Sequence, residues 1–213
     1  MKGARISVLD YGSGNLTSVC RALLHLGAIP QVVSDRSDFV VSNPLIIPGV
    51  GAFPSAMDAI ERGGFRPLIT ESVKAGTPVL GICLGLQILF EIGYEFVPTR
   101  GLGLIAGEVR KIPDLADKNH AAKRTHVGWK PLRVSVWGEN SELFRGVGSK
   151  DHFYFVHSFA VFPAEPAAVL ATHLCHGHEI VSVARKENVL GVQFHPEKSG
   201  RSGLKFLANF LRQ

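Results

Sequence analysis

Short apolar segments alternate with amphipathic segments along the first half of the chain. The segments typical of strands are Arg5–Leu9, Ile29–Val33, Leu45–Ile47 and Pro78–Ile82. The segments typical of helices lie between the capping residue Asn15 and Gly27, and over Ser55–Arg62, Phe65–Lys74 and Leu84–Ile92. Strands that alternate with helices pair in parallel through crossover connections, so this order predicts a parallel sheet with helices on both faces.

The second half changes character after Gly107. We expect strands joined by turns at Trp129–Val136, His152–Phe162, Val169–Leu174, Ile180–Ala184 and Val189–Phe194, and a closing helix at Ser202–Arg212. Strands that follow one another without helices pair antiparallel. The predicted fold class is therefore α/β, with a central mixed, mostly parallel sheet flanked by helices and antiparallel strands in the C-terminal half. With 213 residues, a single domain over 1–213 is expected.

Composition excludes several classes of protein. The net charge of +5 is modest and Lys and Arg are scattered, which argues against nucleic acid as a partner. No apolar run reaches the roughly 20 residues that span a bilayer, so no membrane insertion is expected. The three cysteines are far apart, and the opening residues MKGARISVLD lack the apolar core of a signal peptide. We therefore expect a cytoplasmic protein.

The strongest local signal is Gly81-Ile82-Cys83-Leu84-Gly85, where an apolar strand meets a helix. A sharp strand-to-helix turn needs small neighbours and exposes its central side chain at the carboxyl edge of the sheet. There the helix dipole favours thiolate over thiol, so we predict that Cys83 is a nucleophile. The alternative is a buried structural cysteine, the role we assign to Cys20 and Cys175.

Gln193-Phe194-His195-Pro196-Glu197 follows the last predicted strand and supplies a candidate base. A carboxylate two residues after the histidine can accept its N–H and stabilise the imidazolium. We therefore predict that His195 is the general base and that Glu197 orients it. The alternative is a turn in which both side chains face solvent.

Acyl transfer also needs donors for the developing oxyanion. The N–H of Leu84 follows the nucleophile and is the expected first donor. The segment Gly49-Val50-Gly51 ends another strand and is the expected second, because glycines let backbone N–H groups approach a substrate. As an isolated motif, Pro-Gly is also an ordinary turn.

Two further motifs are weaker indications of a binding site. Asp10–Asn15 follows a strand and begins a helix as a dinucleotide loop does, but Thr17 stands where that loop has its third glycine. His173, Cys175, His176 and His178 resemble metal ligands. They straddle a predicted hairpin turn at Gly177 without a second ligand cluster, so no metal is expected.

The chain resembles the class I glutamine amidotransferases and, within them, the glutaminase subunits of imidazole glycerol phosphate synthases. GICLGLQ and QFHPE indicate the class, and DYGSGN, HVGWK, YFVHSF and PEKSG indicate the subfamily. Further similar blocks are PGVGAF at 48–53 and GLGLIAG at 101–107, so the likeness extends across nearly the whole chain. One departure is Lys130, which stands after Trp129 where the family usually has Asn.

The resemblance implies functional roles for particular residues. It makes Cys83, His195 and Glu197 the catalytic triad, and it places the oxyanion donors at Leu84 and the Gly49–Gly51 segment. The residues implied to hold glutamine are Gln87, Glu95, His157, Ser158 and Phe159, with Glu95 facing the ammonium group. No cofactor is implied.

The resemblance also implies a partner. The expected partner is a (β/α)₈ barrel cyclase or synthase subunit, bound as a heterodimer, which uses the ammonia released from L-glutamine to form imidazole glycerol phosphate in histidine biosynthesis. Alternatives are a glutaminase that serves aminobenzoate, guanylate or pyridoxal phosphate synthesis, a cysteine hydrolase of related fold, and a noncatalytic regulatory module. The intact Cys, His and Glu set argues against the last. We further expect the partner to activate hydrolysis by reorienting a peptide next to Val50.

Overall fold

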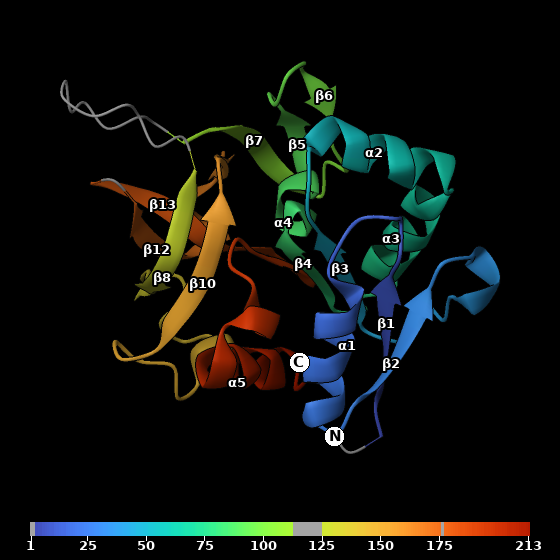
Figure 1. Cartoon of the computed structure of the whole chain (residues 1–213), viewed down its shortest axis with the longest axis horizontal. Helices are drawn as coiled ribbons and strands as arrows, with labels where there is room; N and C mark the ends of the chain where they lie inside the picture. The colour runs from blue at the N-terminus through green and yellow to red at the C-terminus, as the bar shows by residue number, and fades with distance from the viewer. Residues whose placement is uncertain (1–2, 113–124, 176) are drawn as a thin grey trace.

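The computed structural model describes residues 3–112, 125–175 and 177–213. Its main sheet contains β1 (Arg5–Leu9), β2 (Ile29–Val33), β3 (Leu45–Gly49), β4 (Val79–Cys83), β9 (Arg133–Val134), β12 (Val169–Cys175), β13 (His178–Lys186) and β14 (Val189–Val192). Within the described residues, the strand order is β2-β1-β3-β4-β14-β13-β12-β9 (Figure 1). Pairing is parallel from β2 to β14 and antiparallel from β14 to β9. This mixed sheet confirms the predicted fold class.

Helices cover both faces of the sheet. They are α1 (Leu16–His25), α2 (Phe53–Arg62), α3 (Phe65–Lys74), α4 (Leu84–Ile88) and α5 (Gly200–Phe210). Leu45 and Ile47 of β3 pack with α2, α3 and α4, whereas Ile46 packs with α1 and α5 on the other face. Because side chains alternate along a strand, a strand buried on both faces is apolar at every position, which is why the first half has continuous apolar runs.

The segment after the nucleophile differs from the prediction. A helix was expected over Leu84–Ile92, but α4 ends at Ile88 and β5 (Phe90–Gly93) follows. The Leu89 carbonyl, which a longer helix would use, accepts N–H bonds from Leu104 at 2.8 Å and Ile105 at 3.0 Å instead. β5 then joins a second sheet with β6 (Thr99–Arg100), β7 (Ile105–Lys111) and β11 (Phe159–Pro163). Tertiary hydrogen bonds thus override helix propensity here.

Two predicted strands are each divided. Trp129–Val136 separates into β8 (His126–Pro131) and β9, and His152–Phe162 separates into β10 (His152–His157) and β11. β10 pairs with β8, whereas β11 pairs with β7. The Ser158 carbonyl at the break accepts the Ile112 N–H at 2.9 Å, so the chain passes from one sheet to another at this residue.

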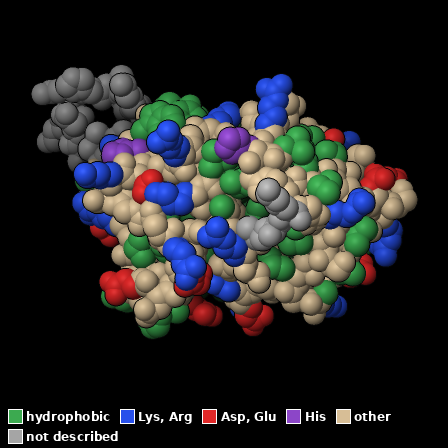
Figure 2. All heavy atoms as spheres, turned by 90° about the horizontal axis from the view of Figure 1, so that it is seen from below, with side chains coloured by type: hydrophobic (Ala, Val, Ile, Leu, Met, Phe, Trp, Pro, Cys, Tyr) green, Lys and Arg blue, Asp and Glu red, His purple; other side chains and the backbone are tan. Residues whose placement is uncertain are grey.

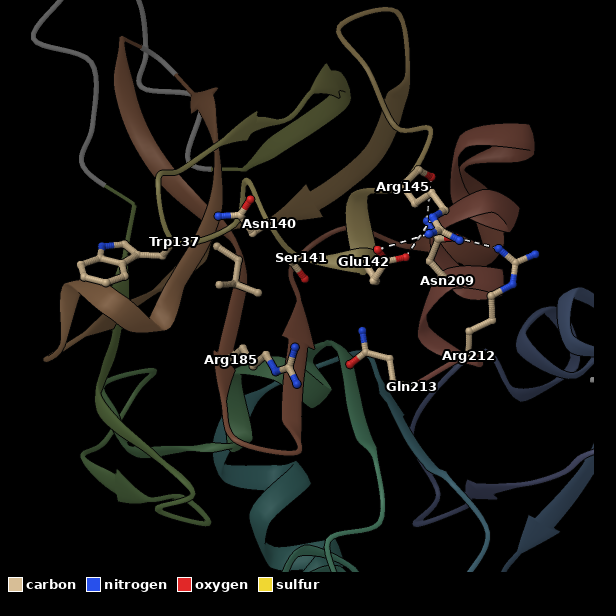
Figure 3. Close-up of a pocket in the computed structure, with 10 residues that line it drawn as sticks. Trp137, Asn140, Ser141, Glu142, Arg145, Arg185, Asn209, Arg212 and Gln213 are labelled. Atoms are coloured by element: carbon tan, nitrogen blue, oxygen red, sulfur yellow. Dashed lines mark hydrogen bonds and ion pairs between the residues drawn. The ribbon is translucent and has the colours of Figure 1, made fainter.

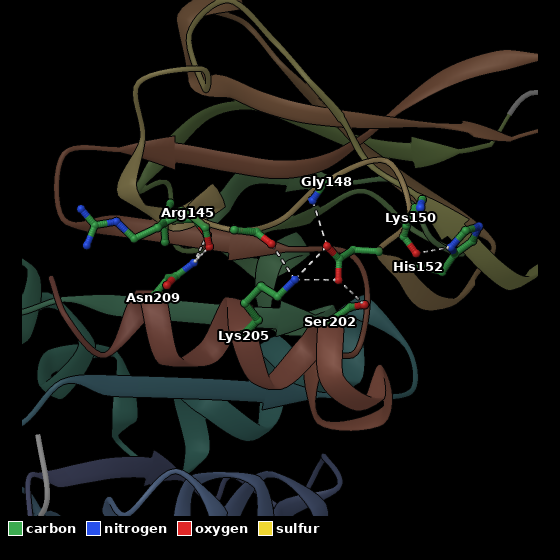
Figure 4. Close-up of polar contacts among 10 residues, drawn as sticks. Arg145, Gly148, Lys150, His152, Ser202, Lys205 and Asn209 are labelled. Atoms are coloured by element: carbon green, nitrogen blue, oxygen red, sulfur yellow. Dashed lines mark hydrogen bonds and ion pairs between the residues drawn. The ribbon is translucent and has the colours of Figure 1, made fainter.

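Helix α5 is fixed to the loop before β10 (Figure 4). Lys205 forms an ion pair with Asp151 at 2.9 Å, and the Ser202 hydroxyl donates to the same carboxylate at 2.8 Å. The Asn209 amide donates to the carbonyls of Leu143 and Arg145, each at 2.9 Å. These bonds hold the C-terminal helix against the segment that leads to the site.

The surface agrees with the modest net charge. On the face shown in Figure 2, Lys and Arg side chains are spread among acidic and apolar ones rather than gathered in a stripe. In the described part of the chain, every helix is too short or too polar to span a membrane.

Candidate active site

Cys83 occupies a strained turn between β4 and α4. Its φ is 57° and its ψ is −109°, a conformation that residues other than glycine rarely adopt. A Cβ on Gly81 would lie 2.4 Å from the Gly85 carbonyl oxygen, and a Cβ on Gly85 would lie 1.8 Å from the Ile47 oxygen. Both glycines are therefore required by close backbone packing, and the sharp turn expected from the sequence is present.

His195 and Glu197 lie just beyond β14, which ends before the predicted Phe194. The His195 Nδ1 is 2.8 Å from the Glu197 Oε1, and both side chains are buried. The His195 backbone N–H donates to the Tyr154 carbonyl of β10 at 2.9 Å, and its carbonyl accepts the Ser199 hydroxyl at 2.6 Å. The carboxylate fixes the tautomer in which Nε2 is free to act on a neighbouring group.

Burial by itself lowers the pKa of His195, but Cys83 and Glu197 raise it to about 10. The imidazole is thus a strong base, and the Cys83 thiol is one of the two groups that set its pKa. A thiol beside a basic imidazole can transfer its proton and become a nucleophile.

The candidate oxyanion segment lies beside the turn. Gly49 of β3 is in register with Cys83 of β4, and a Cβ on Gly49 would lie 2.3 Å from the Tyr11 hydroxyl oxygen. The Val50 N–H donates to the Ser13 Oγ at 3.3 Å, and the Ser13 hydroxyl donates to the Val50 carbonyl. The Ser13 hydroxyl therefore contacts both the N–H and the carbonyl of Val50, which belong to the two peptide groups on either side of its Cα.

A cavity of about 350 Å³ brings most of the predicted residues together. Its lining is Val50, Gly51, Cys83, Leu84, Gln87, Glu95, Thr125, Val156, His157, Ser158, Phe159 and His195. Gly49 lies outside this lining, and Glu197 is buried in contact with His195. The cavity therefore combines the candidate nucleophile, the candidate base and polar side chains around a space suited to a small polar substrate.

Residues 7–213 match the family model described as glutamine amidotransferase class-I. The chain belongs to this family. It is 42% identical over 207 residues to the imidazole glycerol phosphate synthase subunit HisH of Geobacillus thermodenitrificans, which covers 97% of this chain and 94% of the relative. The subunit HisH 1 of Legionella pneumophila is 39% identical over 209 residues, covering 97% and 98%.

Longer and more distant proteins are also similar to this amidotransferase. The chloroplastic imidazole glycerol phosphate synthase hisHF of Arabidopsis thaliana is 41% identical over 97% of this chain but only 34% of its own length. Among solved structures, PurLQS from Thermotoga maritima has a TM-score of 0.74 at 20% identity, covering 100% of this chain and 99% of that one. That likeness supports the fold.

The amidotransferase uses two of the predicted glutamine-binding residues in its own framework. The Glu95 Oε2 accepts the N–H of Phe53, the first residue of α2, at 2.7 Å. The Gln87 amide nitrogen donates to the Phe159 carbonyl and to the Gln193 Oε1, both at 3.1 Å. The Gln87 amide nitrogen is therefore engaged within the protein.

Three residues at the site were not predicted from the sequence. The Gln193 Nε2 lies 3.7 Å from the Cys83 Sγ, and Thr125 and Val156 line the cavity. Gln193 precedes His195 by two positions, and side chains two apart in extended chain share a face, so that spacing was a usable signal. Thr125 has no signal in its local sequence.

A larger cavity, of about 680 Å³, lies elsewhere in the amidotransferase (Figure 3). Trp137, Arg145, Arg185 and Arg212 are among its lining residues, and it contains none of the predicted site residues. The Arg145 guanidinium is paired with Glu142 at 2.9 Å. The residues that line a cavity, rather than its volume, therefore identify the candidate active site.

The two weaker motifs have different outcomes. In the loop Asp10–Asn15, Asn15 caps α1, and a Cβ on Gly14 would lie 3.2 Å from the Pro48 oxygen, so the loop packs against the oxyanion segment. The predicted metal-like set does not assemble as a unit. His173 and Cys175 are buried, His178 is exposed, and His176 lies outside the described residues. His173 and Cys175 instead meet His126 of β8.

Proposed function

We propose that this amidotransferase is the glutaminase subunit of an imidazole glycerol phosphate synthase. It hydrolyses L-glutamine to glutamate and ammonia, and a cyclase subunit uses the ammonia to form imidazole glycerol phosphate and an aminoimidazole carboxamide ribotide in histidine biosynthesis. The observation that carries this proposal is the strained Cys83 turn beside His195, whose pKa is raised to about 10, in the wall of one cavity.

Before the reaction the Cys83 proton resides on the His195 Nε2, because the pKa of that imidazole is raised to about 10. The thiolate then attacks the side-chain amide carbon of glutamine, and backbone donors at Leu84 and the Gly49–Gly51 segment stabilise the oxyanion. His195 returns the proton to the departing ammonia, which leaves a glutamyl thioester on Cys83. Water attacks this thioester with His195 as base, which releases glutamate and restores the thiol.

The remaining lining residues hold the amino-acid end of glutamine. Glu95 is the acidic side chain of this lining, which supports a contact with the substrate ammonium group. Gln87 and the His157–Phe159 segment complete the wall. Glu197 does not touch the substrate and acts by holding the His195 imidazolium. No step requires a cofactor.

The partner is a (β/α)₈ barrel cyclase, bound to a single-domain subunit of residues 1–213 as a heterodimer in the cytoplasm. Support comes from the relatives described as subunits, and from the Arabidopsis relative, whose length greatly exceeds the matched part. Val127 and Trp129 of β8 are exposed large apolar side chains that suit a protein interface. Lys130, the departure from the family pattern, alternates with Trp129 along β8 and shares the face of His126 instead.

The test measures glutamate release by the chain alone, with the barrel cyclase from the same source, and with the cyclase plus its nucleotide ligand. We expect slow hydrolysis by the chain alone and a rise of at least about tenfold in the complete mixture, as a coupling of about 1.4 kcal/mol would give. Activation only by an aminobenzoate, guanylate or pyridoxal phosphate synthase would instead assign the chain to that pathway. No glutamate under any condition would overturn the proposal.

A further inference from the structure

A second cluster of histidine and cysteine lies outside the lining of the catalytic cavity. It consists of His126 on β8 with His173 and Cys175 on β12, all three buried. One ligand atom from each residue lies within 4.8 Å of the other two. Two imidazoles and a thiol at this spacing are the donor set that zinc takes in proteins.

The two ring nitrogens of His173 differ in their contacts. Its Nδ1 lies 2.8 Å from the Ser182 Oγ, and its fully buried Nε2 has no hydrogen-bond partner within the described ranges. Histidines that bind metals usually donate the other ring N–H to an oxygen, which fixes the tautomer and directs the remaining lone pair at the ion. The Ser182 contact supplies that arrangement.

A cation lies near the cluster. The Lys130 ammonium group acts electrostatically on both His173 and Cys175, so it opposes a metal ion bound between them.

We propose that His126, His173 and Cys175 bind one Zn²⁺ ion. Binding forms one Zn–S and two Zn–N bonds and releases the Cys175 thiol proton to solvent, and a water molecule takes the fourth position. Ligand atoms around a tetrahedral zinc lie about 3.6 Å apart, given Zn–N and Zn–S lengths of roughly 2.1 and 2.3 Å, so the side chains must draw inward. The ion would tie β8, and through it the β8–β10 sheet, to β12.

The proposal does not depend on the proposed function, because none of its three ligands lines the catalytic cavity. Its location still suggests a consequence. β10, the partner of β8, ends at His157, which does line that cavity. A zinc ion bound to β8 and β12 would therefore fix the position of the cavity wall that contains His157, and it would take no part in the reaction.

The first experiment measures zinc in the full-length protein, in the Cys83→Ala background so that the catalytic thiol cannot bind metal. We expect about one Zn²⁺ per chain by mass spectrometry. Cobalt substitution should give a thiolate-to-Co²⁺ charge-transfer band. No zinc after incubation with a micromolar excess of the ion, or a cobalt spectrum without that band, would overturn the proposal.

The second experiment compares variants in that background by competition with a chromogenic chelator. Cys175→Ala and His173→Ala should each lower zinc affinity at least about tenfold, and Ser182→Ala by roughly tenfold. Lys130→Met should raise it, because the cation near His173 and Cys175 is removed. Cys20→Ala and His25→Ala are matched controls on α1, outside the cluster, and should leave the affinity unchanged. If Cys175→Ala and His173→Ala both keep the full zinc affinity, the ion binds elsewhere, and the assignment is contradicted even when one zinc is bound per chain.

Discussion

Two buried clusters in this amidotransferase pair a cysteine with a histidine, and they have opposite chemistry. The pKa of His195 is raised to about 10 by Cys83 and Glu197 against the effect of burial, whereas burial lowers the pKa of His173 to about 2, with His157, His126 and Lys130 adding to the shift. The difference lies in the third partner. His195 has a carboxylate at 2.8 Å, while His173 stacks on the Phe155 ring at 4.0 Å.

The two cysteines differ in backbone as well. Cys83 stands in a left-handed turn at the end of β4, where its side chain reaches the catalytic cavity. Cys175 stands in regular antiparallel pairing with His178 at the end of β12, away from that cavity. Burial and residue type are therefore shared by the clusters. The proposed nucleophile differs from the proposed metal ligand in the charge of its neighbours and in its backbone conformation.

The largest expected effect separates the two cysteines directly. Cys83→Ala should lower the rate of glutamine hydrolysis by at least about 10⁴-fold, because no other group can form the thioester. Cys175→Ala should keep the rate within about threefold, since a thiol outside the cavity takes no part in the reaction. Glutamate release by both variants, with circular dichroism to verify folding, makes the comparison. Equal losses of hydrolysis rate in the two variants would contradict the assignment of catalysis to Cys83 alone.

The next effect separates the base from the carboxylate that supports it. His195→Ala should lower the rate by roughly 10²–10⁴-fold, the range for loss of general acid–base catalysis. Glu197→Gln should cost less, because an amide oxygen still accepts the His195 N–H. Steady-state rates of both variants test this order. If Glu197→Gln is the more damaging change, another residue is the base.

A smaller effect concerns stability and pH. The pKa of His195 in the folded chain, about 10, exceeds its ordinary value of 6.5, so its charge stabilises the fold fully below pH 6.5. That contribution is lost as pH rises from 6.5 through 10. Wild type should therefore exceed Glu197→Gln in unfolding free energy by about 1.5–3 kcal/mol near pH 6, and by less near pH 10. Urea titrations across this range measure the difference, and one that grows with pH would reverse the assigned sign.

The smallest expected effect concerns the Gly49–Gly51 segment, which lies beside Cys83. Ser13→Ala removes the hydroxyl that hydrogen-bonds the N–H and the carbonyl of Val50. Loss of a hydrogen bond of about 1 kcal/mol shifts a two-state population roughly fivefold, so hydrolysis by the chain alone should rise a few fold. Ser37→Ala is the control, because the Ser37 hydroxyl donates to the Asp35 carboxylate of its own turn at 2.8 Å. A slower Ser13→Ala variant would mean that the serine holds the active orientation.

The catalytic motif was readable because its parts are local. The turn at Cys83 needs Gly81 and Gly85 within two residues on either side, and Glu197 reaches His195 across a single proline. Short-range steric and hydrogen-bonding rules act over such spacings, so the pattern predicts the geometry without knowledge of the rest of the chain. The roles of these residues stay predictions until the variants are measured.

The sequence by itself determined the order of strands and helices up to β4, the parallel pairing of the first half and the turn at Cys83, because periodicity and local sterics decide these features. Only the tertiary structure decided that the helix after Cys83 stops at Ile88, that His152–Phe162 divides between two sheets, and that His126 meets His173 and Cys175. Each of these depends on hydrogen bonds or packing between segments far apart in the chain. Such contacts leave no periodic trace in the local sequence, so folding alone brings them together.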